Sequence, residues 1–213
     1  LGLLTVPGGK NSSLAKENGY VINLDRAEKL EKMTYSSLFS KAGIIVLEDT
    51  DESLLGKVDK LEVCDNNLYV LEKGRGLFLF NKQGKFIKMI GRQGKGPGEY
   101  IDPDDISIDR ENKKIYVLDS QTQNVLKYSG NGTFESSFKL ENKGTRSTFI
   151  QPFKNALYTN LYTFDKSGKR FLLSKVDVTN GKRISFQFEA SQYNKGWNEL
   201  FSTCLLYTSP SPR

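Results

Sequence analysis

The sequence predicts an all-β fold assembled from repeated four-stranded units, and three observations lead to this prediction. The 213-residue chain is 37% hydrophobic and 26% charged, a balance typical of soluble globular domains. Its apolar runs are short, rich in β-branched and aromatic residues, and separated by Asn, Asp and Gly, which is the pattern of strands joined by tight turns. The same order of runs and turns recurs along the chain at a spacing of 47 to 49 residues.

The repeat is read from matching strand and turn residues. Tyr116 follows Tyr69 by 47 positions, and Phe134 follows Phe86 by 48. These offsets divide the chain into three units, at about 58–100, 101–145 and 146–190.

Each unit is expected to contain four short antiparallel strands. In the first unit the apolar runs are 58–63, 68–71, 77–80 and 86–90. In the second they are 105–109, 115–118, 125–128 and 134–138. The third unit is looser, with runs at 156–158, 172–178 and 184–188 and about seven extra residues in its middle hairpin, around 165–168.

Outside the repeats the sequence is less regular. Residues 43–47 predict a lone strand that would complete a blade absent from this chain, and apolar residues three apart over 24–33 permit one or two helical turns. Residues 1–18 are interpreted as the remnant of an export signal or a disordered N-terminus. The last ten residues, 204–213, resemble read-through of a sequencing adaptor, so Cys204 is expected to be foreign and Cys64 to be the native, buried thiol.

A four-stranded unit of about 45 residues is typical of a β-propeller blade. The run from Gly91 to Tyr100 and the strands that follow it resemble the NHL-type repeat. With Leu38-Phe39 and the stretch 47–56 included, the chain resembles more closely the six-bladed propeller proteins of Bacteroidetes. This resemblance implies that residues 19–203 form the N-terminal part of an incomplete six-bladed ring, which would need about 270 residues. A complete four-bladed ring is the alternative arrangement.

Composition excludes several kinds of chemistry. The chain has no histidine, which removes Ser-His-Asp and Cys-His nucleophile pairs and histidine-ligated zinc. Net charge is +6, with the excess between 146 and 188, but these charges alternate along strands rather than forming a block. Nucleic-acid binding is therefore not favoured.

The glycine-rich connection 91–100 is the most ligand-like feature. Pro97 stands where a phosphate-binding P-loop requires lysine, and no helix is expected after it, so a connection between blades is the favoured interpretation. Four of its side chains are predicted to be best placed to reach a ligand: Arg92, Lys95, Glu99 and Tyr100.

Carboxylates crowd the next connection, with Asp102, Asp104, Asp105 and Asp109 close together. They do not fit a calcium loop, because Ile106 occupies a ligand position. Asp104 and Asp105 remain the candidates for a metal, with calcium as the ion, although turn and strand-end roles are favoured.

Two further acidic residues hold a repeated position. Glu72 and Asp119 both follow a Tyr-Val-Leu triplet, which predicts a repeated structural hydrogen bond. Asn160 occupies the corresponding position in the third unit and is expected to break the pattern.

The predicted function is that of a non-catalytic propeller of the bacterial cell envelope that binds a protein, peptide or glycan through loops around its channel. Export to the periplasm or the outer membrane is implied by the resemblance, and no cofactor is expected. The alternative is a metal-dependent hydrolase or lyase that uses Asp104 or Asp105 together with residues from blades outside this chain.

Overall fold

The computed structural model describes residues 34, 39, 43–141, 146–160, 163–164 and 169–189. The chain divides into two compact units, Leu1–Ile44 and Ile45–Arg213, and almost all described residues belong to the second. Four predictions lie outside the described residues: the leader remnant at 1–18, the helical turns at 24–33, the hairpin insertion at 165–168, and the foreign tail at 204–213 with Cys204.

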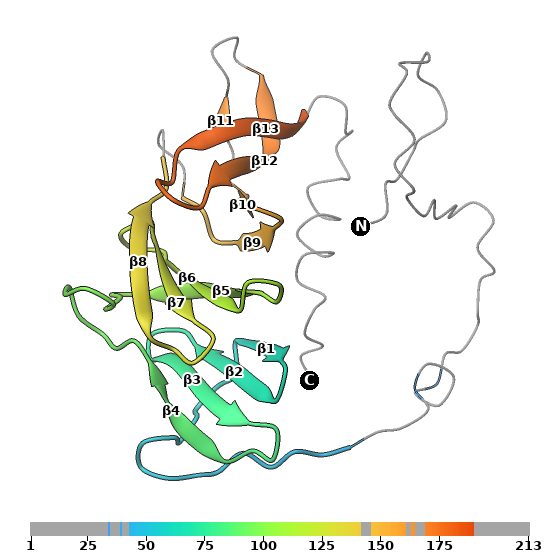
Figure 1. The fold of residues 1–213 in the computed structure, drawn as a ribbon, viewed down its shortest axis with the longest axis vertical. Helices are drawn as coiled ribbons and strands as arrows, with labels where there is room; N and C mark the ends of the chain where they lie inside the picture. Colours follow the sequence, from blue (N-terminus) through green and yellow to red (C-terminus); the bar gives the residue numbers. More distant parts are fainter. Residues whose placement is uncertain are drawn as a thin grey trace. The chain divides into compact units, whose positions relative to one another are not determined.

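The described residues form three antiparallel sheets (Figure 1). The first contains, in spatial order, β1 (Lys60–Cys64), β2 (Asn67–Glu72), β3 (Gly76–Asn81) and β4 (Phe86–Ile90). The second contains β5 (Pro103–Asp109), β6 (Lys114–Asp119), β7 (Asn124–Ser129) and β8 (Phe134–Lys139). Each is a simple meander, so strands that follow one another in sequence also pair in space.

The third sheet has five strands: β9 (Ile150–Phe153), β10 (Ala156–Thr159), β11 (Thr163–Phe164), β12 (Arg170–Asp177) and β13 (Arg183–Glu189). The C-terminal half of β12 pairs with β10, and its first two residues pair with β11. Because β13 takes the other edge of β12, β10 and β11 together fill the place of one strand. The prediction of an all-β fold made of antiparallel units is therefore confirmed, with four strands in each of the first two sheets and five in the third, where the sequence pattern missed β9 and β11.

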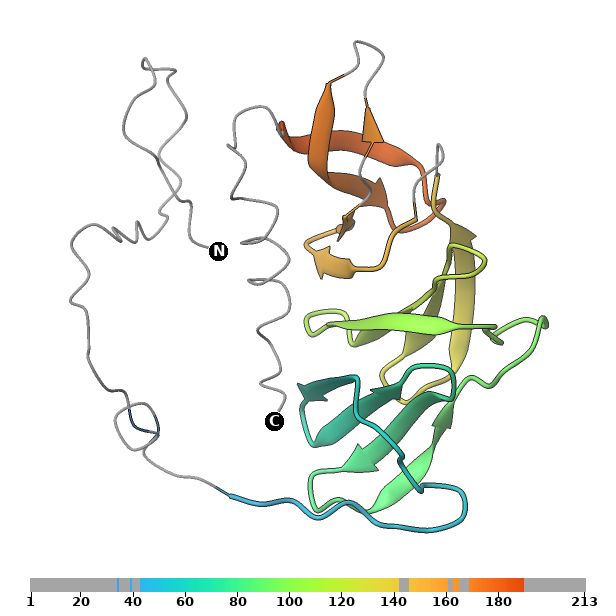
Figure 2. The same ribbon diagram turned by 180° about the vertical axis from the view of Figure 1, so that it is seen from behind.

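Two apolar cores join the sheets face to face. The first lies between sheets one and two and includes Leu71, Leu77, Ile106 and Val117. The second lies between sheets two and three, where Leu118 and Leu157 are fully buried. β5 contacts both β1 and β9, so the first strands of the three sheets lie side by side (Figure 2). Cys64 is buried, as predicted.

The strand predicted at 43–47 is not formed, and residues 43–50 belong to no strand. Leu47 of this segment packs, with Leu55, on the outer face of the first sheet against Phe78 and Phe80. Its backbone contact with that sheet is the hydrogen bond from the Glu48 amide to the Gly84 carbonyl, 2.7 Å. A strand requires a paired neighbour along its length, and none of the described strands provides one.

Candidate functional site

The two candidate metal ligands are each engaged by a lysine. The Lys73 ammonium lies 2.7 Å from Asp104, and the Lys60 ammonium lies 2.7 Å from Asp105. Asp105 is buried, and its second oxygen accepts the amide of Ile150 at 2.8 Å. The carboxylate thus links the first strands of all three sheets, and metal binding would require both ion pairs to break.

Burial raises the pKa of Asp105, and the neighbouring Lys60 ammonium opposes this shift. Glu62 lies 3.9 Å from the same ammonium, and Arg110 lies 3.7 Å from Glu62. Negative and positive side chains therefore alternate from Asp105 through Lys60 and Glu62 to Arg110. Within the described ranges no group of three or more Cys, Asp or Glu side chains has the arrangement of a metal site.

Glu72, Asp119 and Asn160 do share one structural role. Each accepts a backbone amide from the segment that enters its own sheet: Glu72 from Gly56 at 3.3 Å, and Asp119 from Ile101 at 2.8 Å. The expectation that Asn160 breaks the pattern is wrong, because its amide oxygen accepts the amides of residues 148 and 149 at 3.0 and 3.1 Å. An amide oxygen and a carboxylate oxygen are equivalent acceptors for this purpose.

The glycine-rich connection joins β4 to β5 and folds around the carboxylate of Glu99. One oxygen accepts the Gly96 amide at 2.8 Å, and the other accepts the Arg92 guanidinium at 2.6 Å. These two hydrogen bonds lower the pKa of Glu99, so the loop holds it as a carboxylate. A Cβ at Gly94 would lie 2.0 Å from the same carboxylate, so a larger residue there would require the Glu99 side chain to move.

Tyr100 is buried and its hydroxyl is fully used. It accepts the Leu77 amide at 3.1 Å and donates to the Ile90 carbonyl at 2.9 Å, which ties the end of the loop to two strands of the first sheet. Burial raises the pKa of Tyr100 to about 12. Its burial does not fit the predicted contact with a ligand, and its role is structural.

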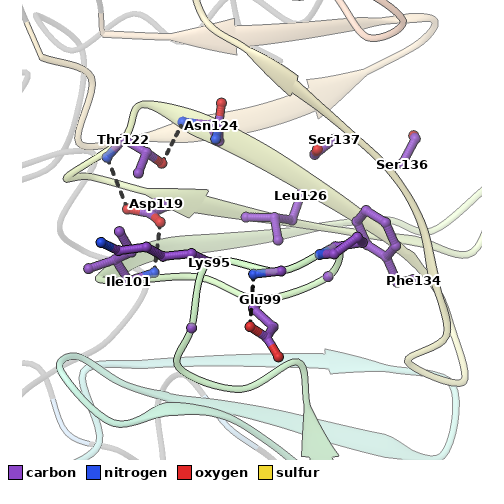
Figure 3. A pocket seen from close by; sticks show the side chains of 14 residues that line it. Lys95, Glu99, Ile101, Asp119, Thr122, Asn124, Leu126, Phe134, Ser136 and Ser137 are labelled. Carbon is purple, nitrogen blue, oxygen red and sulfur yellow. Dashed lines mark hydrogen bonds between the residues drawn. The ribbon is translucent and has the colours of Figure 1, made fainter.

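A pocket of about 670 Å³ lies beside this loop, bounded by residues 94–99 on one side and by β7 and β8 on the other (Figure 3). Leu126 and Phe134 supply apolar lining, and Asn124 and two serines of β8, Ser136 and Ser137, supply polar lining. Lys95, Ile101 and Asp119 are labelled in Figure 3 and line the same pocket. Lys95 and Glu99 are the predicted site residues that line this pocket, whereas Arg92 contacts it through Glu99.

The free polar groups of the pocket are one cation and neutral donors. Glu99 and Asp119, its two carboxylates, are both occupied by hydrogen bonds. In contrast, the Lys95 ammonium and the Asn124 amide group make no hydrogen bond or ion pair with the part of the chain that the structure describes. The pocket therefore has donors for an anionic or polar ligand and an apolar surface from Leu126 and Phe134.

Asn124 and the two serines were missed by sequence reasoning. They lie 30 to 43 positions from Gly94, and no motif links them to the loop. The repeat offers one sequence signal for them, because it predicts β7 and β8, the two successive strands that line the pocket and begin at residues 124 and 134.

None of the curated proteins compared with the chain matches it. Across the described ranges, no helix is long and apolar enough to cross a membrane. The crystal structure of a Bacteroides fragilis protein predicted to be exported is similar, with a TM-score of 0.59 and 25% identity over 68% of this chain. The match covers 41% of that protein, so this chain spans about two fifths of its length.

Two further crystal structures are more distant. A Bacteroides caccae protein of unknown function matches with a TM-score of 0.45 and 14% identity, over 63% of this chain and 50% of that one. The U3-55K protein matches with a TM-score of 0.48 and 16% identity, over 67% and 41%. Neither similarity is close enough to bear on function. A family profile described as a domain of unknown function (DUF4934) matches residues 19–207, and the chain therefore belongs to that family.

Proposed function

We propose that the chain is part of an NHL-like six-bladed β-propeller of the bacterial cell envelope, and that it binds an anionic or polar ligand without catalysing a reaction. The pocket between the glycine-rich loop and β8 is the proposed binding site. Its ligand contacts would come from Lys95 and Asn124, with Glu99 and Arg92 holding the loop in shape.

The propeller part of the proposal is supported by a repeated interface. Tyr69 faces the second sheet and Tyr116 faces the third, and both are buried. Tyr158 holds the same position in the third sheet but is only half-buried. A face with the same design at the end of the array is expected when further sheets continue the stack.

The binding part rests on one observation, the unengaged Lys95 ammonium at a pocket whose carboxylates are already hydrogen-bonded. An ammonium in such a place attracts an anionic group, and an adjoining apolar surface adds affinity. The absence of histidine from the sequence removes acid–base catalysis by an imidazole within this chain.

Envelope localisation is supported by the similar Bacteroides fragilis protein, which is predicted to be exported. The whole protein from which this chain comes is the right object for a test, because the similar structure is more than twice the length of the matched region.

The test is site-specific photo-crosslinking in living cells of the source bacterium. Ser136, an exposed residue that lines the pocket, is replaced by p-benzoyl-phenylalanine in the whole protein, and the control carries the same replacement at Lys82, an exposed residue in the β3–β4 turn. The proposal predicts a discrete crosslinked product in the envelope fraction from position 136 and none from position 82. Equal crosslinking from both positions, or a protein found in the cytoplasm, would contradict it.

A further inference from the structure

The pocket beside the glycine-rich loop opens onto a face of the second sheet. Leu126 and Ser137 are partners across β7 and β8, so their side chains share that face. Asn124 lies two residues before Leu126 on the same strand, and therefore on the same face. Residues 94–99 form the opposite wall (Figure 3). A ligand in the pocket therefore meets side chains that stand on a sheet face.

The polar groups that β7 and β8 offer to the pocket are neutral. The Asn124 amide group and the hydroxyls of Ser136 and Ser137 make no hydrogen bond with the part of the chain that the structure describes. The Thr122 hydroxyl oxygen accepts the backbone amide of Asn124 at 3.3 Å, which leaves its proton for a ligand. Because amides and hydroxyls both donate and accept, they match a ligand that carries several hydroxyl groups.

The charged groups of the pocket suit one negative charge. Lys95 is the cation among the lining residues, and its ammonium has no partner in the described ranges. Glu99 and Asp119 line the same pocket, and their hydrogen-bonded carboxylates repel further negative charge. A ligand with a single carboxylate is therefore favoured over a dianion.

A phosphate group is disfavoured for a second reason. Backbone amides and guanidinium groups are common partners of phosphate in proteins. In this loop the Gly96 amide and the Arg92 guanidinium already bind Glu99, at 2.8 and 2.6 Å. The Lys95 ammonium is a compact charge without a bidentate fork, and it pairs equally well with a carboxylate.

A peptide that adds to the sheet as a further strand is also disfavoured. β8 is the outer strand of its sheet, but Tyr128 pairs with Phe134 and Lys127 pairs with Ser136. Glu135 is therefore an extra residue in β8. A bulge of this kind bends a strand and interrupts the regular edge that strand addition requires.

The apolar lining suits the carbon skeleton of a sugar ring. Phe134 is half-buried and meets Tyr128 edge-on, with ring centroids 5.7 Å apart, and Pro97 lines the pocket from the loop. The pocket volume of about 670 Å³ lies within the range of roughly 300–1,000 Å³ that is typical of small-molecule sites. A sugar combines an apolar C–H surface with a rim of hydroxyls, which is the combination that this lining accommodates.

We propose that the ligand of this pocket is an acidic saccharide, whose bound unit carries one carboxylate and several hydroxyls. The carboxylate pairs with the Lys95 ammonium, and the hydroxyls bind Asn124 and Ser137. This inference rests on the proposed function, because it names the ligand class of the same site.

Isothermal titration calorimetry of the whole protein tests the proposal with three acidic probes: trigalacturonic acid, a hyaluronan tetrasaccharide and sialyllactose. Maltotriose is the neutral control, glucose 6-phosphate the phosphate control and triglutamate the peptide control. At least one acidic saccharide is expected to bind about 10-fold or more tightly than every control. Titration with the acidic monosaccharide of that probe then distinguishes a free sugar from a longer glycan as the source of the bound unit.

Matched variants separate the contact with the carboxylate from the contacts with the hydroxyls. Lys95→Gln removes the charge and should weaken binding of the acidic saccharide by about 10-fold, together with its dependence on salt. Ser137→Ala should weaken binding and leave the salt dependence unchanged. The control is Lys82→Gln, at the exposed residue in the β3–β4 turn, which should change neither.

Failure of all three acidic saccharides to bind would overturn the proposal, and so would equal weakening by Lys95→Gln and Lys82→Gln. Tighter binding of triglutamate would assign the pocket to a peptide instead. The crosslinking test separates this inference from the proposed function. A product from position 136 that contains a second polypeptide would overturn the saccharide and leave a binding function in place, whereas the loss of both crosslinking and saccharide binding would contradict both.

Discussion

Glu99 shows how a single carboxylate shapes the candidate site. The residue accepts the Gly96 amide and the Arg92 guanidinium, and these hydrogen bonds hold the glycine-rich loop against the pocket. Arg92 itself is largely exposed, so the ion pair alone contributes little in water. The backbone hydrogen bond to Gly96 is the contact that fixes the loop.

Glu99→Gln should therefore destabilise the loop at neutral pH and not in acid. Because the folded pKa of Glu99 is lowered, its stabilising effect is present above the unfolded value of 4.5 and is lost as pH falls through the folded value. The measurement is hydrogen exchange of the Gly94 and Gly96 amides in both proteins from pH 7 to pH 3. A difference that stays constant across this range would show that charge has no part in holding the loop.

Tyr100 illustrates the opposite sign. Its folded pKa of about 12 lies above the ordinary tyrosine value of 10.0, so the folded protein keeps the phenol proton more tightly than the unfolded chain does. The contribution of this proton to the free energy of unfolding is fully present below pH 10 and is lost as pH rises towards 12. The loss is roughly 3 kcal/mol, since each pKa unit corresponds to about 1.4 kcal/mol.

Tyr100→Phe is expected to remove this alkaline loss and to cost about 2 kcal/mol at neutral pH, because the amide of Leu77 and the carbonyl of Ile90 lose a buried partner. Urea unfolding at pH 7 and pH 11 measures both effects. The control is Tyr158→Phe, at a half-buried residue whose hydroxyl makes no hydrogen bond within the described ranges. Equal costs for the two variants would contradict a special role for Tyr100.

At the scale of the element, the turns before the last strands fix how neighbouring segments meet. Gly84 and Gly181 both have positive φ, 85° and 73°, and both lie in contact with the backbone of a preceding segment. The turn therefore does two things at once: it reverses the chain and it gives the preceding segment a surface to rest on. The second task is invisible in a turn motif, which describes only local conformation.

Gly84→Ala separates these two tasks when it is compared with Gly74→Ala. Gly74 also has positive φ, 78°, but a Cβ there would meet nothing within 4 Å. In both variants the free energy of unfolding should fall by about 1 to 2 kcal/mol, because alanine is strained at positive φ. Gly84→Ala should lose more and should release 45–48 from the first sheet, seen as faster amide exchange at Glu48. If the two variants have the same free energy of unfolding, the contact between Val46 and the turn does not contribute to stability.

At the scale of the whole molecule, one buried ion pair connects all three sheets. The Asp105 carboxylate pairs with Lys60 of β1 and accepts the Ile150 amide of β9. Burying a carboxylate is costly, and the ion pair offsets that cost only while both partners are present. We therefore expect the pair to contribute more to the alignment of the sheets than to their stability.

Asp105→Leu is expected to destabilise the protein by about 3 kcal/mol, because the Lys60 ammonium is left without its buried partner. Adding Lys60→Met should restore much of the loss, since an apolar pair of similar volume suits the same place. Chemical denaturation of the two single variants and the double variant gives the coupling energy. Strictly additive losses would show that the two side chains act independently.

The same ion pair allows the calcium hypothesis to be tested directly. Calcium at Asp104 and Asp105 would have to displace both lysines, so titration with calcium should leave the melting temperature of the chain unchanged. A rise in melting temperature with calcium that is lost in Asp105→Leu would support a metal site.

Local chemistry made much of the fold predictable from the sequence. Short β-branched runs, Asn and Gly turns and the recurrence of Tyr69 at Tyr116 all express constraints between neighbours in the chain, and they predicted antiparallel four-stranded units. The sequence also singled out the glycine-rich loop, with Lys95 and Glu99 at the candidate site.

Only the tertiary structure decided what those residues meet. Tyr100 and Asp105 were candidate ligand contacts, yet both are buried with their polar atoms occupied. The sequence by itself determined the strands, turns and repeat of this protein, because these depend on neighbours in the chain. Which polar groups are satisfied and which remain for a ligand, as at Lys95 and Asn124, depends on packing between sheets, because their partners come from positions distant in sequence.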